Sequence, residues 1–88
     1  MDISKLRSQI DRADDMLLTS FATRMRLTAS IAEEKKKNGI PVEDPEREKE
    51  KLGMISKAAP SDIEEECVKL YNTILEISKE YQSKLIDK

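Results

Sequence analysis

The sequence contains no histidine, a single cysteine and few aromatic residues (3%). Without a second thiol Cys67 cannot form an intramolecular disulfide, and without histidine the chain lacks the cysteine and histidine clusters that hold zinc. We expect Cys67 to be a small core residue in a reducing compartment.

A long apolar segment is also missing. The first 20 residues carry Asp2, Asp11, Asp14 and Asp15 and no apolar run, so neither a secretory signal nor a membrane span is expected, and a cytoplasmic protein is the default. A formal net charge of -2 and a pI near 5.2 argue against a general nucleic-acid or acidic-membrane surface. Any specificity for anions must therefore be local.

Glycine and proline are scarce, and their positions divide a chain whose 88 residues allow one small domain, residues 1–88. The composition, rich in Leu, Ile, Lys, Glu and Arg, favours an all-α fold. Residues 3–38 contain neither Gly nor Pro. Apolar or small residues recur there at spacings of three and four, namely Ile3, Leu6, Ile10, Ala13, Leu17, Phe21, Thr28 and Ile31. This pattern predicts one long amphipathic helix, with Gly39 just past its end.

Two shorter helices are predicted downstream. Asp44 and Pro45 have the order of an N-cap followed by proline at the first helical position, so a second helix is expected over Pro45 to Lys57. Ser61 and Glu64 have the spacing of a capping box, which predicts the start of a third helix. Its apolar stripe consists of Ile63, Cys67, Leu70, Ile74, Ile77, Tyr81 and Leu85.

The predicted first helix is too long for one small protomer. At 1.5 Å per residue it measures roughly 50 Å, whereas a compact globule of this size has a radius of gyration of about 12 Å. We therefore expect a homodimer in which the long helices pack together and the shorter helices close over the sides.

Charged residues occupy positions of the first helix where apolar residues are expected. Arg24 and Lys35 are 11 residues apart, about 20° out of phase on an ideal helix, and Thr28 and Ile31 lie between them. Snorkelling surface cations are the alternative interpretation, but two cations in the apolar stripe favour a buried anion site. On the third helix Ser78 and Gln82 are one turn apart and can point inward as neutral hydrogen-bonding groups.

The ordered set of these residues resembles the all-helical (type II) chorismate mutases. The resemblance extends from Leu6 to Gln82 and rests on the segments Leu6-Arg7-x-x-Ile10-Asp11-x-x-Asp14, Arg24-Met25-x-Leu27, Ile31-Ala32-x-x-Lys35, Val42-x-Asp44-Pro45-x-Arg47-Glu48 and Ser78-x-x-x-Gln82. It implies an intertwined homodimer of three-helix protomers that converts chorismate to prephenate in phenylalanine and tyrosine biosynthesis. The reaction is a [3,3]-sigmatropic rearrangement that needs no cofactor.

The resemblance also assigns roles. Arg24 and the partner chain's Arg7 would bind the two substrate carboxylates, and Lys35 and Gln82 would donate to the ether oxygen. Glu48 and the backbone around Asp44 would bind the ring hydroxyl. The remaining wall and floor of the site would consist of Arg47, Ser78, Thr28 and Ile31.

Two other functions stay open from the sequence. An isochorismate pyruvate lyase shares this fold and could use the same Lys35 and Gln82 pair, although the complete Asp44, Arg47 and Glu48 segment favours the mutase. A non-catalytic helical dimerisation module is the alternative from another class, and it leaves Arg24 and Lys35 unexplained. Association with another shikimate-pathway enzyme is also possible.

Overall fold

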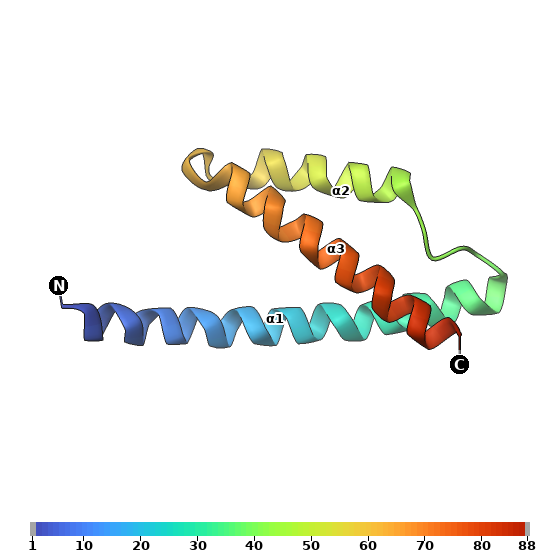
Figure 1. Ribbon diagram of the computed structural model, residues 1–88, viewed down its shortest axis with the longest axis horizontal. Coiled ribbons are helices and arrows are strands. Elements are labelled where there is room, and N and C mark those ends of the chain that lie inside the picture. Colours follow the sequence, from blue (N-terminus) through green and yellow to red (C-terminus); the bar gives the residue numbers. More distant parts are fainter. Residues whose placement is uncertain (1, 88) are drawn as a thin grey trace.

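Three α-helices account for nearly all of the structure. The computed structural model describes residues 2–87, and its helices are α1 (Ile3–Asn38), α2 (Pro45–Ala58) and α3 (Glu64–Ile86) (Figure 1). A single 3-10 turn, η1 (Ser61–Ile63), directly precedes α3. No strand occurs in these residues, so the all-α, three-helix prediction is confirmed.

The ends of α1 follow the local signals. The Asp2 side chain accepts a hydrogen bond from the Lys5 amide at 3.0 Å, which satisfies one free N–H group of the first turn. At the other end Gly39 has a φ of 65°, and the following Ile40 N–H donates to the Lys35 carbonyl at 2.8 Å. The predicted bounds of α1, residues 3–38, are confirmed.

The start of α2 is also as predicted. The Asp44 carboxylate accepts a hydrogen bond from the Arg47 amide at 3.1 Å, and Pro45 takes the first helical position, where no N–H group is needed. The helix continues one residue beyond the predicted Lys57 and ends at Ala58.

The predicted capping box at Ser61 and Glu64 is wrong. Pro60 instead opens the 3-10 turn, because the Ile63 amide bonds back three residues to the Pro60 carbonyl at 3.1 Å. The Glu64 carboxylate instead accepts a hydrogen bond from the Ser56 hydroxyl of α2. This contact joins α2 to the start of α3.

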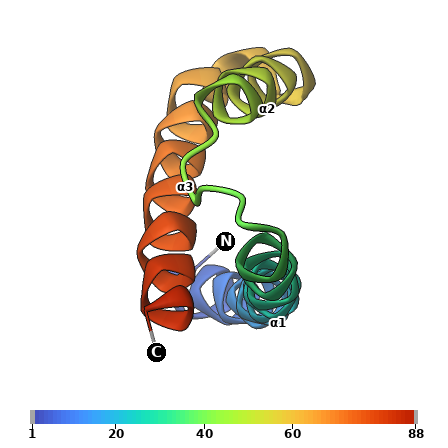
Figure 2. The same cartoon turned by 90° about the vertical axis from the view of Figure 1, so that its right-hand side faces the viewer.

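Helix α3 joins the other two helices. It packs against both α1 and α2, whereas α1 and α2 do not pack against each other within residues 2–87. Viewed along α1, the three helices form an open C with α3 as its back (Figure 2). The protomer is elongated, with extents of 54 × 26 × 14 Å and a radius of gyration of 16.1 Å.

Much of the apolar surface is uncovered in the single chain. Ala32 is the one fully buried apolar residue among those described, and Cys67 is half-buried. Residues 3–20 of α1 are all exposed, including Ile3 at 62%, Ile10 at 57% and Leu17 at 55%. The accessible surface of 7174 Å² exceeds the about 5,300 Å² expected for a compact monomer of this mass. None of the described helices is apolar over a length that would cross a bilayer.

Two glycines provide a matched test of the backbone. Gly39 has a positive φ and Gly53 lies inside α2, and an added Cβ would meet no atom within 4 Å at either position. We expect Gly39→Ala to lower the free energy of unfolding by about 1 kcal/mol, because alanine disfavours the left-handed conformation. Gly53→Ala should raise it by about 0.5–1 kcal/mol through helix propensity.

Urea unfolding followed by circular dichroism, at one fixed protein concentration, measures both changes. Effects of the same sign in the two variants would contradict this account of Gly39.

Candidate active site

A cleft of about 530 Å³ lies where the three helices face one another. Helix α1 and the segment after it form one wall, α2 closes the second side, and α3 forms the third. The lining residues are Arg24, Leu27, Thr28, Ile31, Lys35, Val42, Asp44, Arg47, Glu48, Lys51, Leu75, Ser78, Lys79 and Gln82.

Nine of the ten residues predicted for the site line this cleft; Arg7 does not. Arg7 is exposed on α1, 17 residues before Arg24 and therefore roughly 25 Å away along the helix axis. No side chain spans that distance, so Arg7 cannot reach the cleft of its own chain.

Arg24 is held in the cleft by α3. Its Nη1 donates to the Ser78 Oγ at 2.6 Å, and Ser78 is 5% exposed. One turn further along α1 the buried Thr28 hydroxyl donates to the Arg24 carbonyl at 2.9 Å, so it uses its proton within the helix. Arg24 has no carboxylate partner among residues 2–87, and its other guanidinium donors are available to a ligand.

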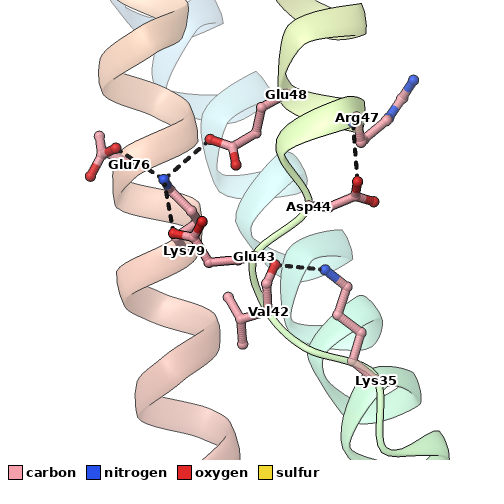
Figure 3. A network of polar contacts seen from close by, with 8 residues as sticks. All are labelled: Lys35, Val42, Glu43, Asp44, Arg47, Glu48, Glu76 and Lys79. Atoms are coloured by element: carbon pink, nitrogen blue, oxygen red, sulfur yellow. Dashed lines mark hydrogen bonds and ion pairs between the residues drawn. The ribbon is translucent and has the colours of Figure 1, made fainter.

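Lys35 connects α1 to the segment between α1 and α2. Its Nζ donates to the Val42 carbonyl at 2.9 Å (Figure 3). No ion pair of Lys35 occurs within the described residues. An ammonium group has three donors, so two remain for a bound molecule.

Gln82 is buried on α3, with 8% of its surface exposed. Its Oε1 is fully buried and has no hydrogen-bond partner among the described residues. Buried polar atoms without a partner are rare in folded proteins and frequently mark functional positions. The burial of Ser78 and Gln82 confirms that both side chains point inward.

Asp44 and Arg47 lie at the rim. The Asp44 carboxylate is used in capping α2, and the Arg47 guanidinium pairs with Glu50 at 3.0 Å on the exposed side of that helix. Figure 3 shows the Arg47 side chain directed away from Lys79 and Glu48. In this conformation Arg47 is a rim residue of the cleft.

Sequence reasoning missed Lys79. Its Nζ lies 3.2 Å from Glu48 Oε1, 3.1 Å from Glu76 Oε1 and 3.5 Å from Glu43 Oε1. The available signal was its position beside Ser78 and one turn before Gln82, which places it at the edge of the same helix face. Four further lining residues were not predicted: Leu27, Val42, Lys51 and Leu75.

The cleft is strongly cationic although the chain is acidic overall. Five of its lining side chains are Arg or Lys and two are Asp or Glu, in a chain of formal net charge -2. Guanidinium and ammonium groups at this density bind carboxylates. The arrangement can bind a carboxylate ligand and stabilise negative charge that develops on it.

Comparison with known proteins agrees with this geometry. The family model described as chorismate mutase type II matches residues 6–83. The chorismate mutase of Methanocaldococcus jannaschii is 31% identical over 87 residues, which cover 97% of this chain and 88% of that protein. No solved structure matches the fold significantly.

Two relatives are much longer proteins. The bifunctional chorismate mutase/prephenate dehydratase of Buchnera aphidicola is 36% identical over 90 residues, covering 99% of this chain and 23% of that enzyme. The T-protein of Enterobacter agglomerans is 40% identical over 58 residues, covering 66% of this chain and 16% of its own length. The match to the family model over most of the chain, together with the cationic cleft, shows that the chain belongs to the type II chorismate mutase family.

Proposed function

We propose that this isomerase rearranges chorismate to prephenate in the cleft between its three helices. The observation that carries the proposal is the pair of cations on the α1 wall. Arg24 and Lys35 both face the cleft, each is fixed by one neutral oxygen, and neither has a carboxylate partner within residues 2–87. A scaffold gains nothing from two uncompensated charges beside buried groups, whereas a dianionic substrate would neutralise them.

The reaction determines what the site has to do. In one concerted step the C–O bond of the enolpyruvyl ether breaks and a C–C bond to the ring forms, so no nucleophile and no proton transfer is needed. The enzyme accelerates this step by holding the flexible side chain over the ring and by stabilising negative charge on the ether oxygen. Fixed cations and hydrogen-bond donors are sufficient for both tasks.

Each side chain then has a role. Arg24, oriented by Ser78, binds one carboxylate with its free guanidinium donors. Lys35 and Gln82 approach from α1 and α3 and donate to the ether oxygen. Glu48 accepts a hydrogen bond from the ring hydroxyl beside the Asp44 backbone, and Thr28 and Ile31 support the ring. Arg47 closes the rim when its guanidinium leaves Glu50.

The second carboxylate requires a second chain. The exposed apolar side chains of residues 3–20, together with an accessible surface roughly 1,900 Å² above that of a compact monomer, support a homodimer with an extensive interface. In an antiparallel pair of long helices, the N-terminal half of one α1 lies along the other chain's cleft. Arg7 of each protomer would then complete the partner's site.

The first test is an assay of the purified protein with chorismate and, separately, with isochorismate, in which prephenate and pyruvate are both measured. Prephenate without pyruvate is expected. Pyruvate released from isochorismate instead would favour the lyase. No turnover of either substrate by a folded dimer would favour the dimerisation module.

Arg24→Ala should lower kcat/KM by about a hundredfold or more, because a charge-assisted contact to the substrate is lost. Its thermal stability should change little, since the guanidinium has no carboxylate partner among residues 2–87 and only the hydrogen bond to Ser78 is lost. Arg26→Ala, an exposed cation on the same helix, is the matched control and should keep full activity. Equal activity of the two variants would rule out the assigned role of Arg24.

Mixing two inactive variants tests the shared site. In a heterodimer of Arg7→Ala and Arg24→Ala chains, one site carries both substitutions and the other carries neither. After complete subunit exchange in an equal mixture, about a quarter of wild-type activity is expected. Absence of recovery, once exchange is verified with differently tagged chains, would show that Arg7 does not act across the interface.

Gln82 predicts a pH profile without an acidic optimum, because an amide donates a hydrogen bond at any pH. In Gln82→Glu the carboxyl group must be protonated to donate, so its rate should fall about tenfold per pH unit above the pKa of the new carboxyl group. Gln82→Leu should be slow at every pH. The measurement is kcat/KM between pH 5 and 8.5, and a flat profile for Gln82→Glu would refute the donor role.

A cytoplasmic location and association with another shikimate-pathway enzyme stay predictions.

A further inference from the structure

Lys79 is the one residue of the cleft wall that carries several ion pairs. Its ammonium group lies within 3.5 Å of three carboxylates, Glu76 on its own helix, Glu48 on α2 and Glu43 in the segment before α2 (Figure 3). The Lys79 side chain is 22% exposed. It therefore connects α3 to two other parts of the cleft.

The three ion pairs differ in their shielding from solvent. Glu76 and Glu43 are 66% and 68% exposed, and pairs of that kind contribute little because water and salt screen them. Glu48 is 25% exposed and lines the cleft. The Lys79–Glu48 pair is thus the shielded one, and it is the one that involves a residue of the proposed site.

We propose that Lys79 is a positioning residue, which holds the Glu48 carboxylate for the ring hydroxyl of the substrate and offsets its negative charge against the substrate carboxylates. This inference rests on the proposed function. Lys79 pairs with Glu48 Oε1. Glu48 Oε2 has no partner among the described residues and remains able to accept a hydrogen bond.

Neutralising the Glu48 charge matters because an unpaired carboxylate in a cleft that binds a dianion would repel the ligand. Without Lys79, Glu48 would place an unpaired negative charge in the cleft, in a partly shielded site where Coulomb interactions are stronger than in water. With the ammonium group 3.2 Å away, the pair is neutral overall. Glu48 can then accept a hydrogen bond without repelling the ligand.

Lys79 also contacts the segment that precedes α2. Glu43 lies between Val42, whose carbonyl accepts the Lys35 hydrogen bond, and Asp44, which caps α2. Lys35 from α1 and Lys79 from α3 therefore contact the same short segment from two sides (Figure 3).

The ammonium form of Lys79 persists over the working pH range. Hydrogen bonds to Glu76 and Glu48 raise the pKa of Lys79 above its ordinary value. For a raised pKa, the stabilisation is fully present below the ordinary lysine pKa and is lost only as the pH rises through the higher value. The effects of substituting Lys79 should therefore be constant between pH 6 and 9.

The test is a double-mutant cycle on KM and kcat, with folding checked by circular dichroism. Lys79→Met keeps the length and apolar stem of the side chain, and should raise KM for chorismate about tenfold with kcat changed less than threefold, because the hydroxyl contact exists in both the bound substrate and the transition state. Lys79→Arg should restore most of the affinity. In a Glu48→Gln background, Lys79→Met should have less than a twofold effect.

A double variant provides the matched control. Glu43→Gln with Glu76→Gln removes both exposed partners and leaves the Glu48 pair, so its kinetics should stay within twofold of wild type. This control also covers the case in which Lys79→Met does not fold. A raised KM in the double variant would overturn the proposal, since Lys79 would then act through its exposed partners.

Other outcomes separate this proposal from the function on which it rests. An equal effect of Lys79→Met in the wild-type and Glu48→Gln backgrounds would mean that Lys79 acts directly on the substrate, and it would overturn the positioning role alone. Wild-type kinetics for Lys79→Met would also overturn the positioning role alone. A wild-type protein that does not turn over chorismate would overturn the proposed function and this inference together.

Discussion

The structure depends on the mismatch between the length of α1 and the surface that its own chain can cover. Helix α1 has 36 residues, and α3 covers only its C-terminal half, where the buried Thr28 and Ala32 lie. The exposed N-terminal half carries apolar side chains at helical spacing, and burial of such side chains is the main source of folding free energy. In the dimer proposed above, one surface would therefore serve both the stability of the fold and the completion of the site.

The buried residues beside the cleft do not form an apolar core. They are mainly polar, namely Thr28, Ser78 and Gln82, and Ser78 accepts the hydrogen bond that orients Arg24. The Arg24 and Lys35 side chains are fixed by neutral oxygens, which keeps their charges available for a ligand. A site of this kind is preorganised for an anion at some cost in the stability of the free protein.

The segment from Gly39 to Asp44 connects α1 to α2 and contacts the Lys35 side chain. Gly39 ends α1 in a left-handed conformation, the Val42 carbonyl accepts the Lys35 hydrogen bond, and Asp44 starts α2. The turn thus places α2 on the far side of the cleft from α1, with α3 between them. Glu48, in the first turn of α2, reaches the cleft because this segment is held at both ends.

The bounds of α1 and the Asp44 cap of α2 followed from the sequence, since periodicity and capping depend on residues within four positions of each other. The ten site residues came from the resemblance to a known family, and nine of them line the cleft. The start of α3 did not follow from the sequence, because Glu64 bonds to Ser56 on another helix. Lys79 was missed for the same reason: two of its three ion-pair partners, Glu43 and Glu48, lie on other segments of the chain. The packing of α3 between α1 and α2 decides which charges meet across the cleft. No local sequence pattern encodes which residues of separate helices come into contact.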